Sequence, residues 1–96
     1  MTAHHIIYQQ HVRRAGGDLY DPRNLVVVSD VEHERHHNRS RPFALSQLPD
    51  SAFEFAAELL GPDAAFNYLR RRYAGDDPRL DALLETLQPA SGELTG

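Results

Sequence analysis

Four histidines of this chain could bind a metal ion together. His33 and His37 lie four residues apart in V-E-H-E-R-H-H-N-R (residues 31–39), a segment whose pattern predicts a helix. On a helix this spacing places both imidazole rings on one face. A second pair, His4 and His5, opens the chain. Because neutral imidazole is the commonest protein ligand for transition metals, we ask whether these histidines form a metal site.

Composition limits the classes of protein to which the chain can belong. Its 96 residues suffice for one small domain, and a core of that size is usually marginal unless a metal, a disulfide or a partner chain adds stability. Cysteine is absent, which excludes disulfides and cysteine-based zinc sites. The chain shows no signal peptide and no apolar run that could span a membrane, so we expect a cytoplasmic protein without a membrane partner.

The distribution of charge bears on nucleic-acid binding. A formal net charge of -4 argues against tight binding of nucleic acid through overall electrostatics. Residues 1–41 are nevertheless close to neutral, with six arginines against five carboxylates, and they contain all six histidines. Every basic residue of the chain is arginine, whose guanidinium suits bidentate contacts with phosphate. Any contact with DNA is therefore expected to depend on local arginines.

The first part of the chain predicts a strand, a long loop, a second strand and a helix. A β-branched and aromatic run predicts a strand over 4–10, and L-V-V-V predicts an antiparallel partner over 25–28. Turn signals G-G at 16–17 and D-P at 21–22 mark the loop between them. Ser29 or Asp30 can then cap a helix that runs to about Asn38.

After residue 41 the pattern becomes that of a helical bundle. A capping-box pattern, Ser51-x-x-Glu54, predicts the start of a first helix, and G-P at 61–62 ends it and starts a second. D-P at 77–78 starts a third helix, which Pro89 closes. The apolar stripes of these helices are expected to form a core: Phe53, Ala56, Ala57, Leu60, Ala65, Phe66, Leu69, Tyr73, Leu80, Leu83, Leu84 and Leu87.

Taken in order, H-H-I-I, G-G-D, D-P-R-N-L-V-V-V and H-x-x-x-H resemble the HNH endonucleases of the ββα-metal, or His-Me finger, superfamily, especially the small HNH proteins of bacteriophages. R-P-F-A-L-S-Q-L-P-D-S-A-F-E-F-A-A-E-L-L-G and A-A-F-N-Y-L-R-R-R-Y-A-G are similar to a helical extension that some of those phage proteins carry. The resemblance implies an α+β fold with a ββα-metal motif at 1–41, a helical extension packed on it at 42–88, and a flexible tail at 89–96.

The resemblance also implies a role for each matching residue. His4 and His33 correspond to metal ligands, and His37 lies where colicin-type members have a third ligand. His5 corresponds to the general base that takes a proton from the attacking water. Asn24 corresponds to the residue that fixes the loop and helps to orient that base.

The implied reaction is hydrolysis of DNA phosphodiester bonds, by nicking or cutting, with one divalent metal ion. Such a metal relieves charge on the phosphate and stabilises the leaving oxygen, and histidine can act as a base at neutral pH. Three imidazole ligands favour Zn, Ni, Co or Mn over Mg, which prefers oxygen ligands. The implied partners are DNA and, by analogy with phage proteins, phage packaging proteins in the host cytoplasm.

Other polar residues have less specific interpretations. Four arginines near the motif could contact DNA or could simply be solvated: Arg13, Arg14, Arg35 and Arg39. The run R-R-R at 70–72 is interpreted first as a solvated helix end and second as a DNA contact. His36 is predicted to be a solvated neighbour off the face of His33 and His37, and His11 has no assigned role.

One departure from the family keeps a second function open. Members with a structural zinc have a C-x-x-C pair where this chain has Ser29 and Glu32. The helices after residue 41, or a partner chain, must then supply the stability that such a zinc provides. The alternative function is a non-catalytic, metal-stabilised module that binds DNA or protein.

Overall fold

A two-stranded antiparallel sheet forms at the start of the chain. In the computed structural model, which describes residues 1–85, strand β1 spans Thr2–His5 and strand β2 spans Leu25–Val28. Their register pairs His4 with Val26. The second strand and the antiparallel pairing are therefore confirmed, and together with five α-helices the sheet makes a small α+β domain within the described residues.

The first strand is shorter than the sequence predicts. The predicted strand over 4–10 is wrong beyond residue 5, because helix α1 already begins at residue 9 and spans Gln9–Arg14. Ile6 and Ile7 are both fully buried, whereas successive residues of a strand point to opposite faces. The chain must leave the sheet here so that both side chains enter the core.

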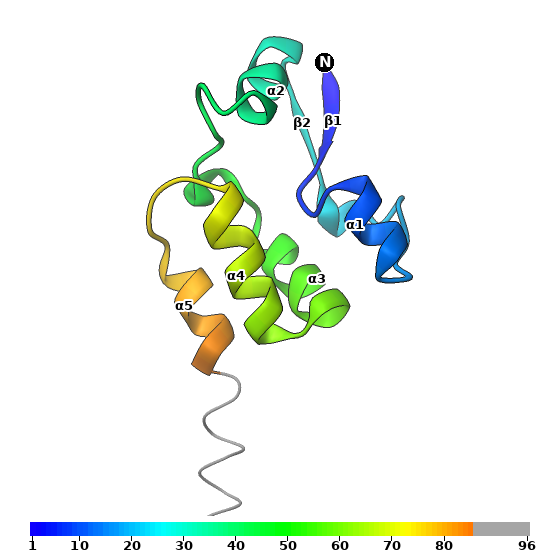
Figure 1. The fold of residues 1–96 in the computed structure, drawn as a ribbon, viewed down its shortest axis with the longest axis vertical. Helices are drawn as coiled ribbons and strands as arrows, with labels where there is room; N and C mark the ends of the chain where they lie inside the picture. Colours follow the sequence, from blue (N-terminus) through cyan, green and yellow to red (C-terminus); the bar gives the residue numbers. More distant parts are fainter. Residues whose placement is uncertain (86–96) are drawn as a thin grey trace, which may run out of the picture.

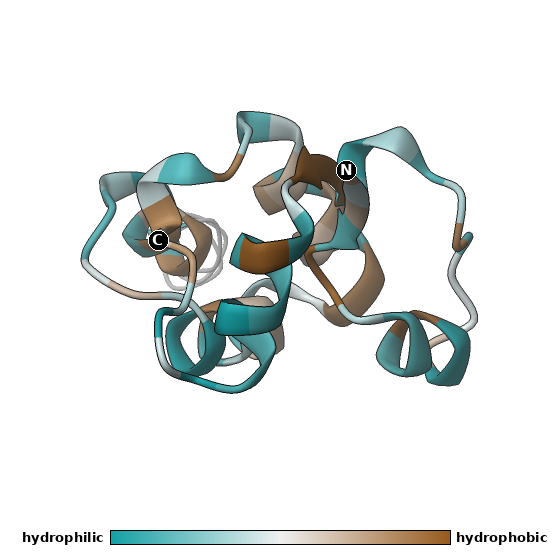
Figure 2. Ribbon diagram, turned by 90° about the horizontal axis from the view of Figure 1, so that it is seen from above, coloured by the Kyte–Doolittle hydropathy of each residue, from teal (hydrophilic) through white to brown (hydrophobic). Residues whose placement is uncertain are grey.

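Helix α2 spans Asp30–His37 and follows β2 directly. The Ser29 hydroxyl oxygen accepts the backbone N–H of Glu32 at 3.1 Å and its O–H donates to the Glu32 carboxylate at 2.8 Å. The predicted cap and the predicted end near Asn38, which is the C-cap, are confirmed. Val31 is the one apolar residue of this helix, so its position depends on polar contacts more than on an apolar stripe (Figure 2 gives the hydropathy along the ribbon).

Three further helices pack against one another: α3 (Asp50–Leu60), α4 (Pro62–Arg72) and α5 (Pro78–Glu85). In Figure 1 they lie below the sheet and α2. Gly61, with φ 87°, makes the turn between α3 and α4 as predicted, because its left-handed backbone disfavours residues with a side chain. Short 3-10 helices at Pro22–Asn24 and Leu45–Gln47 complete the order.

The capping box predicted at Ser51 and Glu54 does not form. Helix α3 begins at Asp50, and its N-cap is Pro49, which makes no side-chain cap hydrogen bond. The proline ring holds φ at -71°, a value that suits the entry to a helix, so the helix starts before Ser51. The predicted residues Leu87 and Pro89, and the tail at 89–96, lie outside the described part of the chain.

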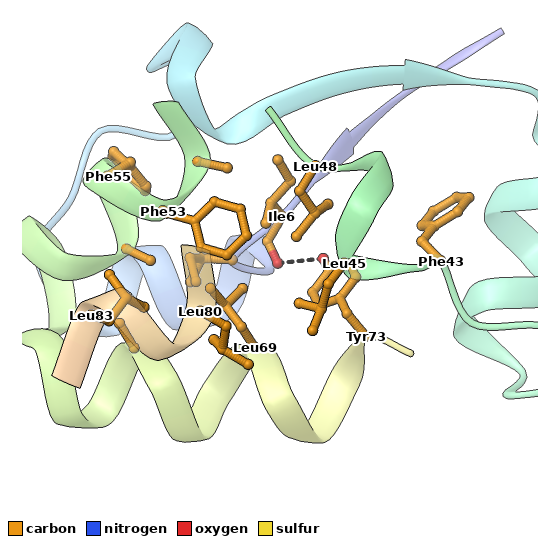
Figure 3. Packing of buried hydrophobic residues seen from close by; sticks show 14 of the residues in the cluster. Ile6, Phe43, Leu45, Leu48, Phe53, Phe55, Leu69, Tyr73, Leu80 and Leu83 are labelled. Carbon is orange, nitrogen blue, oxygen red and sulfur yellow. Dashed lines mark hydrogen bonds between the residues drawn. The ribbon is translucent and has the colours of Figure 1, made fainter. Parts of the chain in front are cut away.

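One core joins the two parts of the molecule. Ile6, from the segment after β1, lies among side chains of the helical part in Figure 3. The Tyr73 hydroxyl donates to the Ile6 carbonyl oxygen at 2.6 Å, the dashed line of that figure. Most predicted stripe residues are buried in this core, and four are only partly buried: Ala57, Leu60, Phe66 and Leu84. Within residues 1–85, no helix combines the length and the apolar character needed to cross a membrane.

Candidate metal centre

Three histidines from two elements lie together beside β1. His4, on β1, is fully buried, whereas His33 is half-buried and His37 is exposed on successive turns of α2. One ring nitrogen from each residue lies within 4.8 Å of the other two. The structure thus brings together the three predicted ligands, close enough to hold a metal ion.

Hydrogen bonds allow the tautomer of His4 to be assigned. The single proton of the Tyr73 hydroxyl goes to the Ile6 carbonyl oxygen, so the Nε2–H of His4 must donate to the Tyr73 oxygen, 2.8 Å away. The Nδ1 atom then carries a lone pair, and it is buried with no hydrogen-bond partner among residues 1–85. A buried, unpaired acceptor is costly, and a metal ligand typically donates its other ring N–H to an oxygen. This atom therefore fits a metal ion.

The spacing of the other two imidazoles also suits coordination. The Nε2 atoms of His33 and His37 are 3.1 Å apart. Two nitrogen ligands on a tetrahedral zinc ion, each about 2.0–2.1 Å from the metal, would lie roughly 3.3 Å apart. Burial, followed by the neighbouring His36, lowers the pKa of His4 to about 3, so its ring is neutral and its lone pair is available at neutral pH.

His5 lines the same cleft, which has a volume of about 480 Å³. Its Nε2 lies 3.1 Å from the Leu19 carbonyl oxygen and must therefore donate its proton to it. The Nδ1 lone pair is left to accept a proton, with the Gln9 side-chain amide 3.5 Å away. No sequence pattern indicated Leu19, because a main-chain carbonyl group is common to every residue. The cleft is lined by Thr2, Ala3, His4, His5, Tyr8, Gln9, Gln10, Arg13, His33 and His37.

Asn24 is fully buried and fixes the chain directly after His5. Its Oδ1 accepts the N–H of Ile7 at 2.7 Å, and its Nδ2 donates to the Ile7 carbonyl oxygen at 2.9 Å. Its own carbonyl oxygen accepts the N–H of Ile6 at 2.9 Å. These bonds satisfy the buried backbone groups at the point where β1 ends.

The prediction that His36 is a solvated neighbour is wrong. Its ring is fully buried and stacks between those of Phe43 and Tyr73, with centroids 4.6 and 4.9 Å away. Its Nδ1 accepts the N–H of Phe43 at 2.9 Å, so its Nε2–H donates to the Tyr8 hydroxyl oxygen at 2.7 Å. Burial lowers its pKa to about 4. Because α2 has no apolar stripe, its sequence pattern did not indicate which face packs on the bundle.

The four arginines that were proposed to contact DNA do not line one common site. Arg13 lines the metal-site cleft, whereas Arg14 and Arg35 line two other pockets. The Arg39 guanidinium donates to the carbonyl oxygens of Arg71 and Arg72, both at 3.2 Å, and so joins the end of α2 to the end of α4.

Comparisons with family models, with curated proteins and with solved structures found no match to this chain. The resemblance to HNH endonucleases therefore stays a hypothesis that depends on the sequence motif. The geometry of the histidine cluster is independent of that motif and is the basis for a proposal about function.

Proposed function

We propose that this chain is a metal-dependent HNH endonuclease that hydrolyses DNA phosphodiester bonds, with β1, β2 and α2 as its ββα-metal motif. The observation that carries the proposal is the histidine cluster: one ring nitrogen from each of His4, His33 and His37 lies within 4.8 Å of the other two, and Nδ1 of His4 is buried without a hydrogen-bond partner among residues 1–85. A core histidine without a metal would be expected to use both ring nitrogens in hydrogen bonds. Phage packaging proteins as partners and the host cytoplasm as location stay expectations from the resemblance.

Three imidazoles would hold one divalent ion and leave coordination positions for phosphate and water. The ligand set favours Zn, Ni, Co or Mn over Mg, because no carboxylate of the described residues joins the cluster. When bound, the ion supplies charge relief on the phosphate and on the leaving oxygen. His4 stays neutral as a ligand because it is buried and its Nε2–H donates to Tyr73.

His5 would take the proton of the attacking water on Nδ1. The Leu19 carbonyl oxygen holds Nε2–H, which fixes the reactive tautomer and stabilises the imidazolium that forms. Asn24 fixes the following backbone and thereby the position of His5 at the end of β1. Arg13, on the same cleft, would contact the phosphate.

The test uses chelator-treated protein, supercoiled plasmid and Mg, Mn, Co, Ni or Zn added back singly. We expect cleavage with one or more of the transition metals. His5→Ala should abolish cleavage while retaining metal binding, measured by calorimetry. Tyr20→Ala is the matched control, because Tyr20 is next to Leu19 and 82% exposed.

Three outcomes would count against the endonuclease. Cleavage that survives His5→Ala would remove the assigned base. If the unaltered protein binds metal but cleaves DNA with none of the five metals, the result would support the non-catalytic binding module instead. Failure of all metals to bind would remove the metal centre itself.

A further inference from the structure

A basic pocket of about 500 Å³ lies between α1 and α4, separate from the metal-site cleft. Three arginines line it, and no carboxylate does, although the chain has 14 acidic residues and a net charge of -4. The resulting local potential favours an anion. Its lining residues are His11, Arg14, Ala15, Leu60, Ala64, Asn67, Tyr68, Arg71 and Arg72.

Two of these guanidinium groups are free to bind. Among residues 1–85, the side chains of Arg14 and Arg71 make no hydrogen bond or ion pair. Arg72 is fixed, because its guanidinium lies 3.8 Å from the centre of the Tyr68 ring and its Nη1 donates to the Tyr68 carbonyl oxygen at 3.4 Å. One anchored and two free guanidinium groups suit the bidentate recognition of phosphate oxygens.

A network of hydrogen bonds joins this pocket to the metal-site cleft. The Tyr68 hydroxyl oxygen accepts the N–H of Tyr8 at 3.0 Å, and the same hydroxyl is hydrogen-bonded to Nδ1 of His11 at 2.6 Å. Tyr8 lines the cleft, whereas Tyr68 and His11 line the pocket. Two neighbouring residues of α1 also face different sites, since Arg13 lines the cleft and Arg14 lines the pocket. The two sites are therefore the two sides of one short helix.

We propose that the basic pocket binds backbone phosphates of DNA beside the bond held at the metal centre, an inference that rests on the proposed endonuclease function. Arg14 and Arg71 contact the phosphate oxygens, and Arg72, held on the Tyr68 ring, adds its charge. Phosphate contacts position a nucleic acid without reading its bases. The pocket therefore gives an acidic protein local affinity for DNA without sequence preference.

The test is binding of a fluorescently labelled DNA duplex to the full chain in chelator, followed by anisotropy over a series of salt concentrations. The variant is Arg14→Gln with Arg71→Gln. The matched control is Arg41→Gln with Arg70→Gln, which removes the same charge at exposed positions outside the pocket. Circular dichroism verifies that both are folded.

We expect the pocket variant to bind DNA more weakly and to show a shallower dependence of log affinity on log salt. The slope should fall by about 0.9 for each phosphate that the variant no longer neutralises. The control should keep the slope of the unaltered chain. Equal slopes for the two variants would overturn the proposal. Binding of inorganic phosphate in calorimetry, with an unchanged slope for DNA, would also overturn it, because the pocket would then bind a free anion.

A small phosphodiester, bis(p-nitrophenyl) phosphate, separates this proposal from the endonuclease. Its hydrolysis by the metal-loaded, unaltered chain reports on the metal centre, since no second phosphate reaches the pocket. Absence of this hydrolysis, with a clear difference in salt slope between the variants, would contradict the endonuclease and support the pocket as a DNA site. Hydrolysis without that difference would support the endonuclease and overturn the pocket.

Discussion

Helices α2 and α4 differ in what holds them in the molecule. Helix α4 buries Ala65 and Leu69 in the core, and partly buried Phe66 packs beside them. Helix α2 buries only His36, although it carries two of the three candidate ligands. Helix α2 therefore has almost no apolar surface of its own to bury, and polar contacts must fix it.

The helical part supplies those contacts. Tyr73, which follows α4, is 4% exposed and bonds both to His4 and to the Ile6 carbonyl oxygen. Its ring also stacks on that of His36. The chain has no cysteine with which to build a structural zinc site. These contacts of Tyr73 instead orient His4 and α2. We therefore expect substitutions where the helical part contacts β1 and α2 to have the largest effects on stability and metal binding.

The largest effect is expected at Tyr73. Tyr73→Ala removes a buried ring and two hydrogen bonds and should lower the free energy of unfolding by about 3–5 kcal/mol, measured by denaturant unfolding. Tyr73→Phe keeps the ring but leaves the Nε2–H of His4 without its acceptor. We expect it to weaken metal binding by about 10–100-fold, measured by calorimetry. Unchanged metal affinity in Tyr73→Phe would show that the bundle does not orient the ligand.

Asn24 should have the next largest effect. Asn24→Ala leaves the N–H and carbonyl groups of Ile7 unpaired in the core and should cost about 2–4 kcal/mol of unfolding free energy. Asn67→Ala, at an exposed position of α4, is the control and should change stability by less than about 0.5 kcal/mol. Similar losses in the two variants would contradict the role of Asn24 in fixing the end of β1.

Acid should destabilise the metal-free protein. Burial lowers the pKa of His4 from 6.5 to about 3 and that of His36 to about 4. The full stability is present above pH 6.5, and it decreases as the pH falls toward 4, because the unfolded chain takes up protons first. The decrease is up to about 1.4 kcal/mol per pH unit for each histidine. Denaturant unfolding with chelator over this range measures it, and His36→Gln should reduce the slope.

The smallest effect is expected at the start of α2. Ser29→Ala removes the hydroxyl that accepts the N–H of Glu32 and should cost about 1 kcal/mol. Ser51→Ala is the informative control, since Ser51 makes no cap on α3 and should leave the unfolding free energy nearly unchanged. A larger loss at Ser51 than at Ser29 would reverse the assignment of the caps.

Local patterns predicted much of this fold. The L-V-V-V strand, the cap at Ser29 and the turn at Gly61 depend on residues next to one another in the chain, and all three are present. The spacing of His33 and His37 likewise placed two imidazoles on one helix face, because a helix has a fixed period. The prediction failed for residues 6–10, where burial of two successive isoleucines outweighed the β propensity of the run.

Only the tertiary structure decided which polar groups meet. His36 is buried rather than solvated because Phe43 and Tyr73, from distant parts of the chain, enclose it. Tyr73, assigned to the core from its apolar stripe, also fixes the tautomer of His4 through a hydrogen bond across 69 residues. The sequence by itself determined the types and the order of the candidate ligands. The packing of the bundle against the sheet decided their burial and hydrogen-bond partners, because those contacts have no period along the chain.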